Sequence, residues 1–152
     1  MVSIPGLGIV SILDPIYSGS HFTWGEATKG GSRIPIATTH NGIFYTAEEI
    51  AQNIIDFAHT LDDIRVQFGN RPISINSWYR TPAINKAAGG KPSSLHLIGF
   101  AADIRVEGIS PMAVYARLSQ SWGGGLGNDG AYTHIDIRDR LEWDSARWHY
   151  PN

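Results

Sequence analysis

The sequence contains no cysteine among its 152 residues. This absence excludes disulfide bonds and thiolate metal ligands, while leaving the redox compartment open. An excess of one charge is also lacking, because 12 basic and 14 acidic residues give a formal net charge of -2. This balance provides no basic surface for nucleic acid, so we expect no nucleic-acid partner.

Long apolar runs are missing as well. No segment approaches the roughly 18 consecutive apolar residues that indicate a membrane span, so we expect no membrane insertion. The first five residues, Met1 to Pro5, lack the basic start and apolar stretch of a secretory signal, and we expect any export to depend on another route. The length suits one monomeric domain over residues 1–152, with an irregular lead-in over 1–45 and a catalytic core over about 46–148.

The most regular periodicity begins near residue 46. Thr46 and Glu49 match a capping box, and apolar residues then recur at steps of four and three until Gly69, which predicts an amphipathic helix. Alternating patterns predict strands elsewhere, and Ser110 with Pro111 predicts another helix start. The other elements expected are strands over residues 73–78, 101–106 and 132–138 and a helix from 110 to about 120.

Two of the expected strands carry polar side chains on one face. Because side chains alternate along a strand, His134 and Asp136 share a face with Tyr132, and Asp103 can point toward a site from its own strand. His96, Asp103 and His134 make up the three nitrogen and oxygen ligands of a catalytic zinc site, which leaves a fourth position for water. The sequence therefore predicts a zinc hydrolase with one zinc ion per chain.

The glycine-rich segment over residues 123–127 lacks the lysine and the following helix of a phosphate-binding loop, which argues against nucleotide binding. We expect it to form a turn over the cleft. The remaining histidines are interpreted as surface or capping residues, and the tryptophans as core or rim aromatics.

Three segments together resemble a known family: Ser77-Trp78-Tyr79-Arg80, then Ser94-Leu95-His96 with Gly99, Ala101 and Asp103, then His134-Ile135-Asp136-Ile137-Arg138. They are similar to the M15 family of zinc peptidases, especially its small M15_3-like branch, over roughly residues 22–148. The family includes D-alanyl-D-alanine carboxypeptidases and phage endolysins. The resemblance implies an α+β fold, with a small antiparallel sheet flanked by helices as in hedgehog and lysostaphin-type domains.

The resemblance also implies an activity. The residues matching the zinc ligands of the family are His96, Asp103 and His134. The implied substrate is a peptidoglycan stem peptide, cut next to a D-amino acid by a D,D-carboxypeptidase or an endopeptidase. Such an enzyme acts outside the cytoplasm or is delivered by a phage or a larger assembly.

One position departs from the family pattern. Many M15 enzymes have a carboxylate three residues before the last zinc histidine as general base, and here that residue is Ala131. Asp136 can replace it, since it lies on the same strand face as His134, and Asp129 is a second candidate from the preceding loop. Asp136 can equally act by orienting a metal ligand or Arg80. Both roles stay open.

Three further residues are candidates for binding substrate. Arg80 matches a family arginine that faces the substrate, where a guanidinium can pair with a carboxylate or polarise a carbonyl. Ser94 contacts substrate or a ligand, or serves only as a turn residue. Tyr132 stabilises the oxyanion or packs.

A different class of function also fits the absent base. A non-catalytic module of a wall-binding or virion assembly can keep zinc as a structural element, and Ala131 is the best support for it. However, structural zinc sites have four protein ligands and only three are evident here, which favours catalysis.

Overall fold

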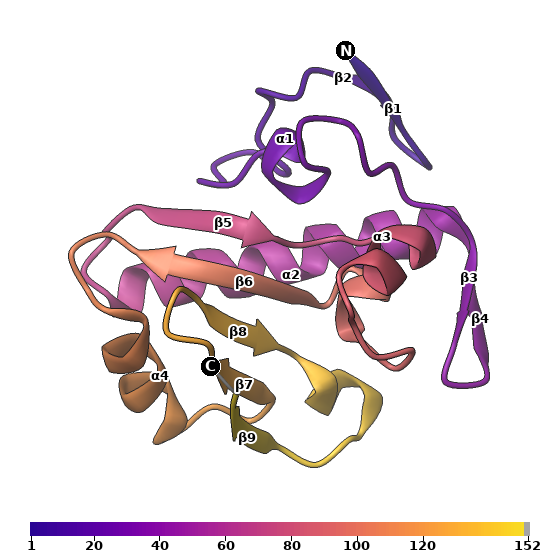
Figure 1. The fold of residues 1–152 in the computed structure, drawn as a ribbon. Coiled ribbons are helices and arrows are strands. Elements are labelled where there is room, and N and C mark those ends of the chain that lie inside the picture. Colours follow the sequence, from indigo (N-terminus) through magenta and orange to yellow (C-terminus); the bar gives the residue numbers. More distant parts are fainter. Residues whose placement is uncertain (151–152) are drawn as a thin grey trace.

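The computed structural model describes residues 1–150, which are arranged around a five-stranded sheet (Figure 1). The strand order is β5-β6-β8-β7-β9; the first four strands pair antiparallel, and β9 pairs parallel to β7. Helices accompany this sheet, so the expected α+β class is confirmed. The strands are β5 (Ile73–Ser77), β6 (Ala101–Val106), β8 (Thr133–Asp136), β7 (Gly125–Asn128) and β9 (Ala146–His149).

The longest helix, α2 (Ala47–Gln67), lies behind β5 and β6 in Figure 1. It begins where the sequence predicts, because the Thr46 hydroxyl accepts from the amide of Glu49 at 3.1 Å and the Glu49 carboxylate accepts from the amide of Thr46 at 3.0 Å. A second helix, α4 (Pro111–Ser119), begins at the predicted Ser110 cap and packs against β6, β7 and β8. The shorter helices are α3 (Pro82–Ala87), η1 (Leu95–Ile98) and η2 (Arg138–Leu141).

The hydrophobic core lies between α2 and one face of the sheet. Ile54 and Phe57 of α2 are fully buried with Ile104 of β6 and Ile135 of β8. Because side chains alternate along strands, the neighbours of these two strand residues point to the opposite face. Within residues 1–150, no helix is both long and apolar enough to cross a bilayer.

The first 45 residues form short elements that lie along the sheet rather than a continuous irregular segment. In Figure 1 the hairpin of residues 2–10 and the short helix of residues 24–27 lie above β5, which is an edge strand. Lys29 donates to the carbonyl of Asn76 in β5 at 2.9 Å, so part of this edge is covered. The elements are β1 (Val2–Ile4), β2 (Gly8–Val10), α1 (Trp24–Ala27), β3 (Thr38–His40) and β4 (Ile43–Tyr45).

The glycine-rich segment, for which the sequence predicts a turn, instead supplies strand β7 between β8 and β9. That prediction is wrong because these glycines allow close approach of other groups. A Cβ atom on Gly125 would overlap the Asp136 carboxylate, and one on Gly127 would overlap the Trp148 indole. Glycine within a strand often marks such a contact.

The last predicted strand is shorter than its alternating pattern. β8 ends at Asp136, because Ile137 has φ -112° and ψ 48° and the chain turns into η2. The predicted faces are still correct for the residues inside the strand, with Ile135 in the core and His134 and Asp136 on the opposite face.

A carboxylate on α2 holds the lead-in to the core. Asp62 accepts hydrogen bonds from the Tyr17 hydroxyl at 2.5 Å, the Ser20 hydroxyl at 2.7 Å and the His21 amide at 3.0 Å. Burial raises the pKa of Asp62, but these hydrogen bonds outweigh it and lower the pKa below its usual value. The ionised form of Asp62 is therefore favoured in the folded state.

Asp62→Asn is expected to lower the free energy of unfolding by about 1–3 kcal/mol at pH 7, because hydrogen bonds to a charged acceptor are lost. Since the folded pKa of Asp62 lies below the unfolded value, this contribution is complete above the unfolded pKa of about 3.9 and declines as the pH falls further. Denaturant unfolding at pH 7 and pH 3 measures the difference. Asp63→Asn, at an exposed neighbour, is the control. Equal stability of Asp62→Asn and wild type at pH 7 would contradict the assignment.

Candidate metal centre and active site

His96 is fixed in η1 by three hydrogen bonds. Its amide donates to the Ser94 hydroxyl at 3.3 Å, and its carbonyl accepts from the amide of Arg80 at 3.1 Å. Its ring Nδ1 donates to the carbonyl of Trp78 at 2.6 Å. The other ring nitrogen, Nε2, is therefore left to face Asp103, from which it lies 3.4 Å away.

The position of η1 depends on Gly99 and Trp78. Gly99 ends η1 with φ 83°, and an added Cβ would lie 2.8 Å from Cγ1 of Ile54 in α2. The Trp78 indole donates to the carbonyl of Gly99 at 3.1 Å, in addition to the contact between its own carbonyl and His96. Trp78 thus holds both ends of the turn that presents His96.

The other two predicted ligands lie on neighbouring strands. Asp103 of β6 pairs in register with His134 of β8, and the Asp103 Oδ1 atom lies 3.1 Å from His134 Nδ1. The ligand atoms of His96, Asp103 and His134 all lie within 4.8 Å of one another, and the three side chains are buried. Zinc bonds of about 2.0–2.2 Å in tetrahedral geometry separate ligand atoms by about 3.3 Å, which agrees with both measured distances. The three residues can hold one metal ion.

The protonation of the site also fits a bound cation. Burial lowers the pKa of His96, which keeps the ring neutral as a metal ligand requires. Burial alone would lower the pKa of His134 too, but hydrogen bonds to Asp103 and Asp136 raise it to about 9. Burial raises the pKa of Asp103, yet the charges and hydrogen bonds of the two histidines hold it well below its usual range. Without a metal, the two buried carboxylates therefore favour a protonated His134 ring, and a metal ion at Nδ1 would take the place of that proton.

Asp136 lies on the other side of the His134 ring from Asp103. Its Oδ2 accepts from His134 Nε2 at 2.9 Å and from Arg138 Nη2 at 2.9 Å. Its Oδ1 accepts from the amide of Gly125 at 2.9 Å and from the amide and Nε of Arg138 at 3.1 and 3.0 Å. Burial raises the pKa of Asp136, but the hydrogen bonds from His134 and Arg138 hold it far below its usual value. These contacts fit a residue that orients His134 and disfavour a proton acceptor.

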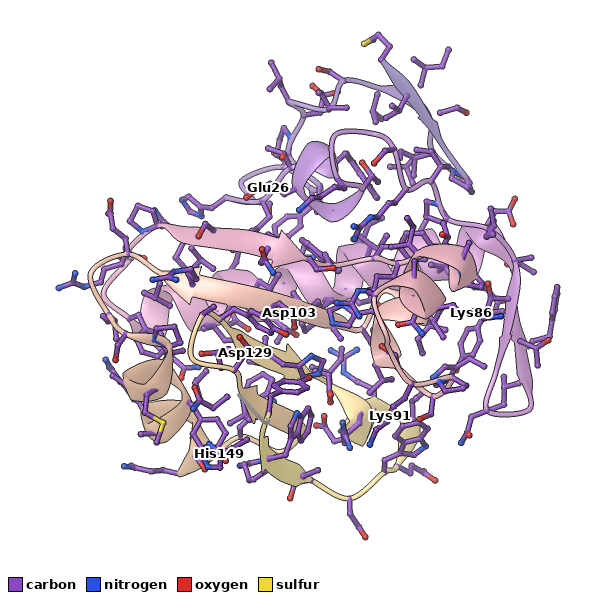
Figure 2. All side chains as sticks on the ribbon, viewed as in Figure 1. Glu26, Lys86, Lys91, Asp103, Asp129 and His149 are labelled. Carbon is purple, nitrogen blue, oxygen red and sulfur yellow. The ribbon has the colours of Figure 1, made fainter. Side chains whose placement is uncertain are left out.

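Asp129, labelled in Figure 2, lies in the connection between β7 and β8. Its carboxylate accepts one hydrogen bond among the described residues, from the amide of Ala131 at 3.4 Å, and so keeps free lone pairs. Burial raises the pKa of Tyr132, and the charges of Asp103 and Asp129 raise it further. Burial has the same effect on Tyr150, whose ring lies 6.2 Å from that of Tyr132. Asp129 and Tyr132 therefore lie in the electrostatic surroundings of the metal ligands.

The two remaining candidates differ in their contacts. Arg80 lies at the site, with Nη2 3.4 Å from Asp103 Oδ2, Nε 3.2 Å from the Ser77 hydroxyl and Nη1 3.5 Å from the Asn85 amide oxygen. Ser94 uses its hydroxyl to cap η1 through the amide of His96. This contact matches the turn role for Ser94, and a substrate contact stays a prediction.

The matched family agrees with this geometry. Residues 23–136 match the model of the peptidase M15 family. The chain belongs to the peptidase M15 family. It is also similar to the zinc D-Ala-D-Ala carboxypeptidase of Streptomyces albus G, with 29% identity over 90 residues, which cover 56% of this chain and 35% of that protein. The chain thus spans about a third of the length of this relative. The M15 family match and this relative support a zinc peptidase with zinc as its cofactor.

Sequence reasoning assigned no role to three groups around the M15 metal centre. The carbonyl of Trp78 orients His96, Arg138 pairs with Asp136, and the Trp148 ring lies 5.2 Å from that of His134. Arg138 could have been found, because it continues the alternation of His134 and Asp136. A backbone carbonyl carries no residue-type signal, and Trp148 reaches the site only through the pairing of β9 with β7.

We predict that the purified protein retains about one zinc ion per chain and that His96→Ala and His134→Ala each lose it. Removing one of three protein ligands leaves too few donors to compete with water and buffer. Metal analysis after dialysis measures the zinc content. His59→Ala, at an exposed histidine on α2, is the control and should keep the metal. Stoichiometric zinc in both ligand variants would refute the assignment.

Proposed function

We propose that this chain hydrolyses peptide bonds of bacterial peptidoglycan stem peptides next to a D-amino acid, as a D,D-carboxypeptidase or an endopeptidase. The observation that carries the proposal is a buried centre with three protein ligands, His96, Asp103 and His134, beside the cationic side chain of Arg80. Catalytic zinc sites keep one coordination position for water or substrate, whereas structural sites have four protein ligands. The relative described as a zinc D-Ala-D-Ala carboxypeptidase supports the substrate class. With such a substrate, the protein acts outside the cytoplasm.

The side chains around the centre have different roles in the proposed reaction. Zinc, when bound, supplies Lewis-acid polarisation of the scissile carbonyl and an acidified water. Arg80 holds the substrate, because its guanidinium can pair with a peptide carboxylate or a carbonyl oxygen. The Tyr132 hydroxyl is a neutral donor near pH 7, since burial and nearby carboxylates raise its pKa, and it can donate to the developing oxyanion.

A proton acceptor completes the reaction. Asp129 suits this role, because its carboxylate is partly exposed and has free lone pairs. The carboxylate of Asp136 is saturated by Gly125, His134 and Arg138, so we assign it the orienting role that the sequence left open. Asp136 then keeps His134 Nε2 protonated and Nδ1 directed at the metal.

Asp129→Asn and Asp136→Asn are expected to give opposite phenotypes. Asp129→Asn should lower turnover by about two to four orders of magnitude, the usual contribution of general acid–base catalysis, while zinc stays bound. Asp136→Asn should weaken zinc affinity about tenfold or more, and excess zinc should restore most of its activity.

Zinc competition with a chelator and turnover at saturating zinc separate the two roles. Asp139→Asn, at an exposed carboxylate of η2, is the matched control for both. An inactive Asp136→Asn at saturating zinc beside an active Asp129→Asn would reverse the assignments.

Mass analysis of purified muropeptides tests the function itself. Zinc-loaded protein should release D-alanine or separate cross-linked stem peptides, and the masses of the products identify the bond that is cut. Arg80→Ala should lower kcat/KM by about 10- to 100-fold, because hydrogen bonds from a cation to the substrate are lost. Its fold and zinc content should stay near those of the wild type, since the three ligands remain.

Arg80→Lys is the matched variant for this experiment. It keeps the charge and loses the planar fork, so it should recover part of the lost efficiency. Unchanged muropeptide masses with zinc-loaded wild type would refute the proposed activity and favour a non-catalytic module. Equal efficiency of Arg80→Ala and wild type would remove Arg80 from the substrate site.

A further inference from the structure

A second guanidinium, that of Arg33, lies beside Arg80. Arg33 follows α1 in the chain, and its Nη1 donates to the Ser77 hydroxyl at 3.1 Å and to the carbonyl of Tyr79 at 3.5 Å. Arg80 donates to the same hydroxyl through Nε at 3.2 Å. The Ser77 oxygen therefore accepts hydrogen bonds from both arginines, which places the two guanidinium groups next to each other.

The backbone around Arg33 is tied down on both sides. The amide of Arg33 donates to the carbonyl of Thr28 at 2.8 Å, and Lys29 is bound to the carbonyl of Asn76. Beyond Arg33, the amide of Ile36 donates to the Tyr79 hydroxyl at 3.1 Å. The Arg33 guanidinium is thus held at the end of β5 and remains only partly exposed.

The two arginines are poorly neutralised by the protein. Among the described residues, Arg80 has one ion pair, the 3.4 Å contact with Asp103, and Arg33 has none. Burial lowers the pKa of Arg33, and the charge of Arg80 lowers it further, which reflects repulsion between neighbouring cations. Asp103 is also a metal ligand in our assignment. Two neighbouring cations, of which one pairs with an already engaged carboxylate and the other with none, favour an anion from outside.

The chemistry of the two guanidinium groups indicates which anion they bind. Nε and Nη2 of Arg33 have no hydrogen-bond partner within residues 1–150, so they can donate to a ligand. Planar guanidinium groups match the geometry of a carboxylate and bind it through two parallel hydrogen bonds. A peptide carboxylate can therefore be held between the arginines, next to the metal centre.

We propose that Arg33 and Arg80 form a carboxylate-binding site and that Arg33 is a specificity-determining residue for carboxylate-bearing peptides. This inference rests on the proposed peptidase function. Two carboxylates of a stem peptide have the required chemistry: the C-terminal carboxylate, and the α-carboxylate of a γ-linked D-glutamate.

Calorimetric binding to the zinc-loaded protein tests this site with two pairs of uncleavable peptides, whose scissile amide is replaced by a ketomethylene group. The first pair ends in D-Ala-D-Ala with a free or an amidated C-terminus. The second pair carries γ-linked D-glutamate with a free or an amidated α-carboxylate. Wild type should bind the free carboxylate about 10- to 100-fold more tightly than the amide in one pair, which identifies the source of the carboxylate. Arg33→Ala should lose most of this preference.

Lys29→Ala is the matched control, because Lys29 is a cation that anchors the same segment to β5 without contacting Arg80 or the ligands. It should keep the carboxylate preference of the wild type. If Arg33→Ala unfolds, Arg33→Gln removes the charge while retaining a donor for Ser77, and it should show the same loss.

The inference is overturned by any of three results: no carboxylate preference in wild type, an unchanged preference in the Arg33 variants, or an equal loss in Lys29→Ala. Its failure differs from that of the proposed function. Hydrolysis of muropeptides without a carboxylate preference refutes the carboxylate-binding site alone, whereas carboxylate-dependent binding without hydrolysis refutes the peptidase activity alone.

Discussion

A buried carboxylate requires compensation, and the Asp103 side chain imposes this requirement on the whole site. An isolated charge in the protein interior is costly unless it is paired or coordinates a metal. His96, His134 and Arg80 all point toward Asp103, each from a different segment of the chain. One negative charge, that of Asp103, is thus surrounded by side chains from β8, η1 and the segment after β5. The same charge favours binding of a metal cation.

Rigid packing around these groups gives the site its geometry. His96 donates to the Trp78 carbonyl and accepts from the Arg80 amide, while His134 is held through Asp136. The glycines of β7 make room for the Asp136 carboxylate and its bond to the Gly125 amide. A site supported in this way presents metal ligands with little reorganisation, which is the condition for tight and selective coordination.

Local patterns were sufficient for the longest helix and for the two strands that carry Asp103 and His134, but not for η1, which carries His96. The capping box at Thr46 and Glu49 gave the start of α2, and the alternation over residues 101–106 gave β6 with its correct faces. The same reasoning failed for β7. Glycine has a low propensity for strands, so the sequence pattern predicts a turn. Here glycine is needed because the side chains of Asp136 and Trp148 lie directly against the strand.

The sequence by itself predicted His96, Asp103 and His134 as a metal-binding set, and the structure brings these three residues close enough to hold one ion. The fold class followed from the resemblance to the M15 family, whereas periodicity, a local property of the chain, predicted individual helices and strands. Only the tertiary structure distinguished the surroundings of Asp136 from those of Asp129 and brought Arg33 to Arg80. A carboxylate's role depends on which donors saturate it, and the role of a cation depends on which charges surround it. These neighbours come from distant segments, so their effects exist only once the chain has folded.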